Sequence, residues 1–176
     1  MEKRNRERLL PFILSAIIII LDQLTKAWVV ATIEQGTVKY SFLSDFLWIC
    51  HVRNSAIGFS LGDGLPEGAK RLLFILLPLV LLVLLGFYLF RSHDLKPFQR
   101  WMLGGIIGGG IGNVVDRIFR PDWVVDFISV NVYGLFGFER WPTFNVADAS
   151  IVVTGILLMI NLLFFEGRGN KEVTNE

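Results

Sequence analysis

Four aspartates are the residues of this chain with the clearest capacity for chemistry. Asp22, Asp116 and Asp148 each border or interrupt a long apolar stretch, and Asp126 lies between the last two stretches. Charged groups near a membrane core are costly and tend to mark function. Two carboxyl groups held close together share one proton, so one can activate water while its partner donates a proton. The residues alone leave open which two aspartates form such a pair.

Other kinds of chemistry have little support in the composition. The single cysteine, Cys50, excludes an intrachain disulfide and a multi-cysteine metal cluster. His51 and His93 lie far apart and lack zinc-ligand spacing. Seventeen Lys and Arg against sixteen Asp and Glu leave a net charge of +1, which argues against a nucleic-acid partner. We therefore expect no metal, no cofactor and no nucleic acid.

The elements that must position the aspartates are membrane spans. Hydrophobic residues make up 53% of the chain and gather in blocks, and a bilayer crossing needs about 20 mostly apolar residues. The pattern predicts an all-α integral membrane protein forming one domain over residues 1–176, with a small extracytoplasmic β-sheet region. Its four transmembrane helices are expected at about residues 9–33, 72–90, 99–118 and 146–165. A cleavable signal at the N-terminus is disfavoured, because the first apolar stretch does not end in small residues.

Basic residues suggest the orientation of these spans. A dense cluster of Lys and Arg precedes the first span, and such a cluster usually stays in the cytoplasm. Both termini are therefore expected in the cytoplasm, which places the aspartates toward the extracytoplasmic face. The outer segments then cover about residues 34–70 and 119–145, and the apolar run 46–52 favours a short sheet.

Side-chain spacing groups the polar residues further, because residues three or four apart share a helix face. The groups are Asp22 with Lys26, Asn113 with Asp116 and Arg117, and Asn145 with Asp148.

Simpler interpretations exist for several of these features. Asn145 could be a helix N-cap with Asp148 in the first turn. Asp22 and Lys26 could be an ion pair that eases insertion, and Asp126 could be a turn residue. The glycines between residues 104 and 112 are explained by close helix packing. None of these interpretations explains why the carboxylates gather at one membrane face, so we favour a functional site.

Five motifs in this order closely resemble the lipoprotein signal peptidase (signal peptidase II) family over nearly the whole chain. They are Asp22-Gln-Leu-Thr-Lys26, Arg53-Asn54-Ser-Ala-Ile-Gly-Phe59, Gly112-Asn113-Val-Val-Asp116-Arg117, Val125-Asp126-Phe127 and Phe144-Asn145-Val-Ala-Asp148.

The resemblance implies a bacterial aspartic endopeptidase of the cytoplasmic (inner) membrane. It implies a diacylglyceryl-modified prolipoprotein as substrate, cut just before the lipidated cysteine, and inhibition by globomycin-type compounds. Asp126 and Asp148 would be catalytic. The supporting or substrate-binding residues would be Asn54, Asn113, Arg117, Asn145, Asp22, Lys26 and Asp116. We expect a monomer in contact with membrane lipid.

One departure from the family pattern and two other hypotheses remain. Ala56 stands where the family often has glycine, and Ala would cost more than Gly if that position needs a positive φ. A small ion- or proton-coupled transporter could also use intramembrane carboxylates. A purely structural membrane subunit would tolerate substitution of both proposed catalytic aspartates.

Overall fold

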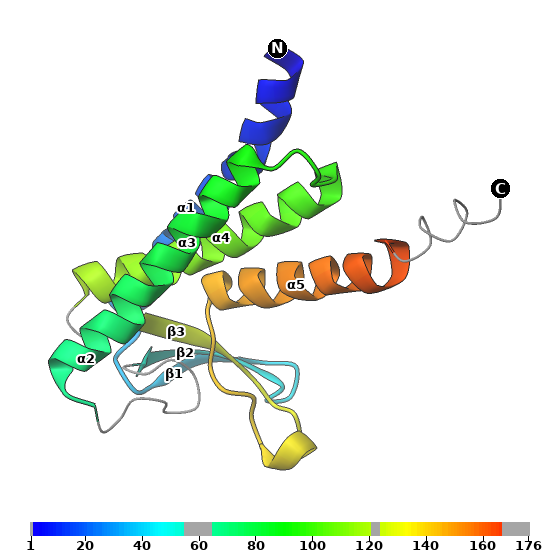
Figure 1. Cartoon of the computed structure of the whole chain (residues 1–176). Helices are drawn as coiled ribbons and strands as arrows, with labels where there is room; N and C mark the ends of the chain where they lie inside the picture. Colours follow the sequence, from blue (N-terminus) through cyan, green and yellow to red (C-terminus); the bar gives the residue numbers. More distant parts are fainter. Residues whose placement is uncertain (1, 55–64, 121–123, 167–176) are drawn as a thin grey trace.

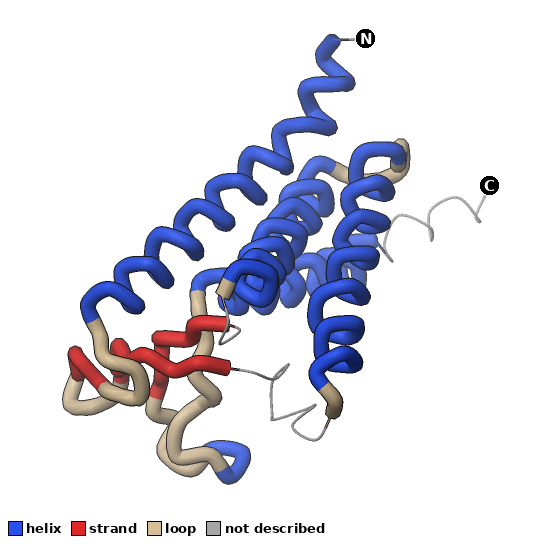
Figure 2. Tube along the Cα trace, turned by 90° about the vertical axis from the view of Figure 1, so that its left-hand side faces the viewer, coloured by secondary structure: helices blue, strands red, loops and turns tan. Residues whose placement is uncertain are grey.

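The computed structural model describes residues 2–54, 65–120 and 124–166, which form a layer of long helices above a small sheet (Figure 1). In chain order the elements are α1 (Glu2–Thr32), β1 (Val38–Phe42), β2 (Leu47–Asn54), α2 (Glu67–Arg71), η1 (Leu72–Leu76), α3 (Leu77–Arg91), α4 (Pro97–Phe119), β3 (Val124–Val130), η2 (Leu135–Gly137), α5 (Val146–Asn161) and η3 (Leu162–Glu166). The tube view shows the same separation, with the strands at one end of the helices (Figure 2).

Membrane-spanning character is clear for three of the four expected helices. Within the described residues, three helical stretches are long and apolar enough to cross a membrane: Arg8–Thr32, Gly68–Arg91 and Val146–Phe165. The expectation of four such stretches is therefore met only in part. The difference lies in α4, because its glycines and its polar residues near both ends lower the apolar content. Most of its surface is instead buried by neighbouring helices, so α4 needs less apolar surface of its own.

Glycines let α1 and α5 approach α4 closely. Ser15 of α1 donates a 2.6 Å hydrogen bond to the carbonyl of Gly104, and Ser150 of α5 donates one of 3.0 Å to the carbonyl of Gly105. At Gly108, an added Cβ would lie 2.8 Å from the Cα of Ser15, which is closer than real side chains come. The small-residue pattern between residues 104 and 112 therefore serves helix packing, as the sequence predicts.

The sheet lies where the sequence predicts a short one, in the outer segments. Its strands run antiparallel in the order β1-β2-β3, and β2 pairs with β3 from Leu47 opposite Val130 to Asn54 opposite Val124. The apolar side chains of β3 pack on the end of α1, with Val29 and Val125 in one buried cluster. This packing holds Asp126, near the start of β3, against the helix ends.

We predict that the α1–α4 contact is sensitive to a single methyl group. Gly108→Ala should lower the free energy of unfolding by about 1–3 kcal/mol, because the new Cβ meets the Ser15 backbone, which cannot move aside without separating the helices. Gly86→Ala on α3 is the matched control, since nothing lies within 4 Å of its added Cβ. Thermal unfolding in detergent should show a loss for Gly108→Ala alone. An equal response of the two variants would contradict this account of the interface.

Candidate active site

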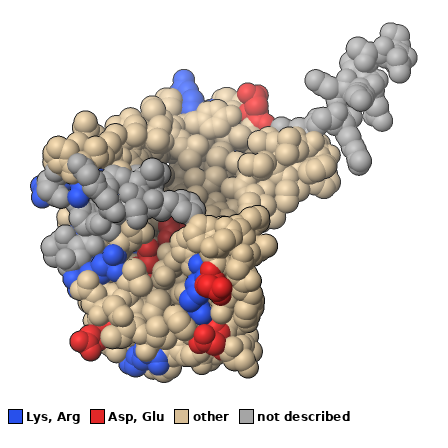
Figure 3. All heavy atoms as spheres, turned by 90° about the horizontal axis from the view of Figure 1, so that it is seen from below, with Lys and Arg blue, Asp and Glu red and all other residues tan. Residues whose placement is uncertain are grey.

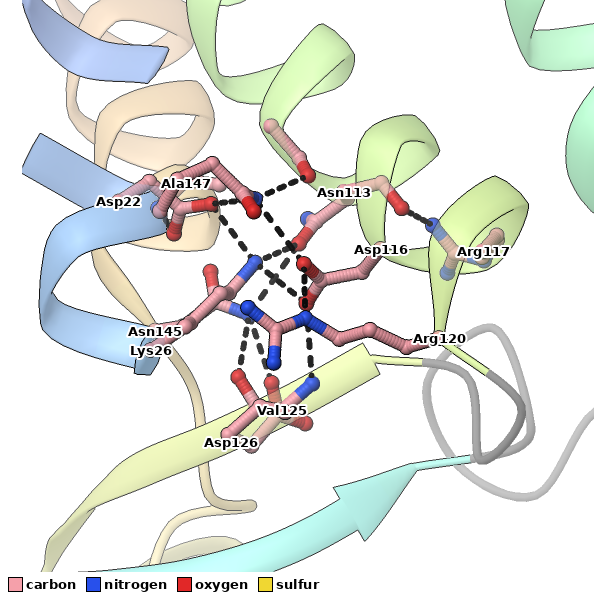
Figure 4. A network of polar contacts seen from close by, with 12 residues as sticks. Asp22, Lys26, Asn113, Asp116, Arg117, Arg120, Val125, Asp126, Asn145 and Ala147 are labelled. Carbon is pink, nitrogen blue, oxygen red and sulfur yellow. Dashed lines mark hydrogen bonds and ion pairs between the residues drawn. The ribbon is translucent and has the colours of Figure 1, made fainter. Parts of the chain in front are cut away.

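A fully buried lysine, Lys26 of α1, forms the centre of a polar network between α1, α4 and β3. The Nζ atom of Lys26 lies 2.7 Å from Oδ2 of Asp22 and 3.0 Å from Oδ2 of Asp116, and all three side chains have zero exposure. Lys26 also donates to Oδ1 of Asn113 at 3.1 Å. Figure 4 shows these side chains converging from α1 and α4. Since an unpaired buried charge is very costly, the lysine and the two carboxylates depend on one another.

The carboxylates of Asp22 and Asp116 also anchor backbone from other elements. Oδ1 of Asp22 accepts a 3.0 Å hydrogen bond from the Ala147 N–H at the start of α5. Oδ2 of Asp116 accepts one of 3.1 Å from the Val125 N–H of β3. Gly112 leaves room for this arrangement, because an added Cβ there would lie 2.8 Å from Oδ2 of Asp22. Asp22 and Asp116 therefore join α5 and β3 to α1 and α4, the two helices that carry these aspartates.

Gln23 and Arg120 complete these contacts, although the sequence predicts a role for neither of them. Gln23 donates to Oδ1 of Asp116 at 2.9 Å, and Arg120 donates to the same oxygen at 3.0 Å. The spacing of four residues between Asp116 and Arg120 is a signal that could have identified the arginine. Gln23 falls within the first of the five motifs, but no spacing rule links it to Asp116.

Asn113 connects the buried lysine to Asp148. A lysine can only donate hydrogen bonds, so the Asn113 oxygen must face Lys26 and its NH₂ group must face the other way. That NH₂ group donates to Oδ1 of Asp148 at 2.7 Å. The buried cation thus fixes which end of the amide meets the Asp148 carboxylate.

Asn145 plays the same part for Asp126. Its Oδ1 accepts from the Asp148 N–H at 2.9 Å, which makes Asn145 the N-cap of α5 as one of the simpler interpretations predicted. Its NH₂ group therefore points to the sheet and donates to Oδ1 of Asp126 at 2.7 Å. Asn54 donates to Oδ2 of Asp126 at 3.0 Å. Capping and contact with Asp126 are thus two uses of one side chain.

Asp126 and Asp148 differ in their surroundings. Asp126 is only 2% exposed, whereas Asp148 is half-buried. Burial raises the pKa of Asp126 to about 7, with a further contribution from the negative charge of Asp148, while the hydrogen bonds from Asn54 and Asn145 oppose the rise. Seen from the sheet side, acidic atoms are visible in a recess of the surface (Figure 3). The arrangement can therefore hold a proton on Asp126 at neutral pH.

Arg117 lies at the edge of the network. Its Nη1 donates to the Asn113 carbonyl at 3.2 Å, and Figure 4 shows it on the far side of Asn113 from Lys26. Its positive charge is near enough to interact with Asp126 and Asp148. Ala56, the departure from the family pattern, lies outside the described residues. Among the residues that the structure does describe, no group of three or more His, Cys, Asp or Glu could hold a metal ion.

Comparison with known proteins identifies the family. A family model described as signal peptidase (SPase) II matches residues 14–164. The chain belongs to the signal peptidase II family. The lipoprotein signal peptidase of Treponema pallidum (strain Nichols) is 40% identical over 98% of this chain and 90% of its own length. That of Treponema denticola is 46% identical over 90% of this chain and 91% of its own length.

Solved structures agree with this assignment. One bacterial membrane enzyme, solved at 2.3 Å resolution, matches with a TM-score of 0.77 and 26% identity over 92% of each chain. A second, solved at 1.9 Å, matches with a TM-score of 0.74 and 28% identity over 88% of this chain and 93% of its own. Membership of the signal peptidase II family makes the protein a protease, and its apolar helices fit a bacterial inner membrane protein. The transporter hypothesis has no support in these comparisons.

We predict that removing the buried cation destabilises the fold. Lys26→Met should cost about 3–5 kcal/mol of unfolding free energy, because Asp22 and Asp116 would remain buried without their counter-ion. Adding Asp22→Asn to this variant should cause little further loss, since it removes one of the two unpaired charges. The measurement is unfolding in detergent with Lys39→Met, an exposed lysine, as control. A Lys26→Met loss no larger than the control's would refute the role of this charge cluster.

Proposed function

We propose that this protein is a membrane aspartic endopeptidase that removes the signal peptide from diacylglyceryl-modified prolipoproteins just before the lipidated cysteine. The observation that carries the proposal is the chain of hydrogen bonds that links the Asp126 and Asp148 carboxyls through the side-chain amides of Asn145 and Asn113. Family membership supports the same reaction, since the curated relatives at 40% and 46% identity are lipoprotein signal peptidases.

In this mechanism the two aspartates have different tasks. Asp126 has a pKa of about 7 and holds the shared proton, while the ionised Asp148 accepts a proton from the attacking water. The protonated Asp126 donates a hydrogen bond to the scissile carbonyl and stabilises the oxyanion that develops there. Asp148 then returns its proton to the leaving amine. The supporting observation is that Asp148 is the more exposed of the two and can receive water.

The supporting residues divide into positioning and binding groups. Asn113 and Asn145 use both ends of their amides within the network, so we assign them to holding the carboxylates. Asn54 and Arg117 are half-buried beside Asp126 and Asp148, and we assign them to binding the substrate backbone. Asp22, Lys26 and Asp116 act as the structural support beneath them.

The same proposal includes the membrane arrangement. We infer that α4 is a fourth transmembrane helix, because α1 and α5 pack on both sides of it and hide its polar residues. Both termini then lie in the cytoplasm and the aspartate pair lies toward the extracytoplasmic face. The acyl chains of a lipidated cysteine stay in the bilayer, so they fix the depth of the bond beside it. The protein would act as a monomer in contact with membrane lipid, and globomycin-type inhibitors would occupy the aspartate pair.

The first functional prediction concerns the two carboxyl groups. Asp126→Asn and Asp148→Asn should each lower cleavage of a diacylated prolipoprotein by about 10²-fold or more, since each removes one proton-transfer group. Asp94→Asn is the matched control, because Asp94 is exposed and lies in the α3–α4 connection. The assay is in vitro cleavage by purified protein in lipid, with an unlipidated substrate in parallel. Full cleavage by either site variant would remove that residue from the catalytic role.

The second functional prediction concerns pH. The active form has Asp126 protonated and Asp148 ionised, so kcat/KM should fall about tenfold per unit as the pH rises above about 7 and Asp126 loses its proton. Asn54→Ala removes a hydrogen bond that favours the ionised carboxylate, so the alkaline fall should move to higher pH. A profile that rises through pH 7, or one that Asn54→Ala shifts downward, would exclude Asp126 as the proton donor.

A further inference from the structure

A cavity of about 210 Å³ lies at the end of the helices opposite the aspartate pair. Its lining includes Arg8 of α1, His93 of the α3–α4 connection, and Arg100 and Trp101 of α4. Arg8 precedes Asp22 by 14 residues along α1, which is about 21 Å at 1.5 Å per residue. The cavity is therefore separate from the proposed active site.

The charge of this cavity is positive. Nη2 of Arg8 lies 2.9 Å from Nδ1 of His93 and 3.2 Å from its Nε2. Because arginine only donates, His93 must accept at this contact. Asp94 is exposed, and among the side chains that the structure describes no carboxylate forms an ion pair with Arg8 or Arg100. Among the described side chains, the two guanidinium groups of the cavity therefore have no carboxylate counter-ion.

Arg100 is built into the cavity wall. Its side chain is only 8% exposed, and it donates to the carbonyls of Leu89 at 2.9 Å, Ser92 at 2.6 Å and Leu95 at 3.2 Å. These carbonyls fix the guanidinium at the end of α3 and supply partial charges only. A buried cation of this kind is stabilised by any anion that enters the cavity, because the local dielectric constant is low.

We propose that this cavity binds the phosphodiester headgroup of an anionic phospholipid from the leaflet opposite the active site. Basic pockets between membrane helices on the cytoplasmic side suit such headgroups. A volume of about 210 Å³ is below the range of about 300–1,000 Å³ typical of drug-sized ligands, so it suits the headgroup alone. The acyl chains would lie along exposed apolar residues of α1, among them Leu9 and Ile13.

The position of Trp101 and the charges of lipid headgroups both support this assignment. Trp101 is 38% exposed at the cavity, and tryptophan is enriched at the membrane–water interface. The choline of phosphatidylcholine would meet the two arginines as a like charge, whereas phosphatidylglycerol carries no cation.

The proposal rests on the inferred membrane crossing of the helices, but it does not depend on the catalytic assignment of Asp126 and Asp148.

The test is binding of phosphatidylglycerol and phosphatidylcholine to the full-length protein in detergent, measured by native mass spectrometry without substrate. Wild type should bind phosphatidylglycerol in preference, and Arg8→Gln should weaken that binding about fivefold, the loss expected for one basic residue near a lipid surface. Arg8→Lys should retain most of it. Arg91→Gln is the matched control, since Arg91 is an exposed basic residue in the last turn of α3 and does not line the cavity.

Three results would overturn the proposal. One is equal weakening by Arg8→Gln and Arg91→Gln, which would indicate general surface attraction. Another is equal binding of the two lipids. The third is an Arg8-dependent response to inorganic phosphate, at matched ionic strength, without any to phosphatidylglycerol, which would make free phosphate the ligand. Since no substrate is present, each result is independent of whether the protein cleaves prolipoproteins.

Discussion

The pairing of one buried lysine with two buried carboxylates is the constraint on which the site depends. Lys26 cannot leave its position between Asp22 and Asp116 without leaving charge unpaired in a region closed to water. From this fixed cation the direction of each hydrogen bond follows in turn, through Asn113 to Asp148. The position of the buried charges therefore determines the orientation of the amide that contacts Asp148.

The framework can form only because α4 allows close approach from both sides. Its glycines bring α1 within contact distance of the α4 backbone, and Gly112 leaves the space that the Asp22 carboxylate occupies. The same small residues reduce the apolar surface of α4, which explains why, of the four expected spans, the described α4 lacks the composition of a helix exposed to lipid. Because neighbouring helices bury α4, its sequence can be more polar than that of a helix exposed to lipid.

Much of this could be predicted from the sequence. Apolar blocks locate the helices, and the run at residues 46–52 locates a strand of the sheet. Spacing rules pair Asp22 with Lys26 and make Asn145 the cap of α5, because these relations are local. The contacts of Gln23 with Asp116 and of Asn145 with Asp126 join segments far apart in the chain, and no periodicity encodes them. For the same reason the sequence leaves the four aspartates as equivalent candidates. Only the three-dimensional contacts separate them, because Asp22 and Asp116 pair with Lys26 whereas Asp126 and Asp148 accept from side-chain amides.

The register of β3 has a consequence for how the site assembles. Successive side chains of a strand point to opposite faces, so a slip of one residue would turn Asp126 outward while leaving the outline of the sheet nearly intact. The Val125 N–H donates to Asp116, and the Asp126 carboxyl accepts from Asn145. Both hydrogen bonds form only when β3 is in its observed register. The alignment of β3 and the placement of the Asp126 carboxyl therefore depend on the same two contacts, and a chain that docks β3 one residue out of register would lose both.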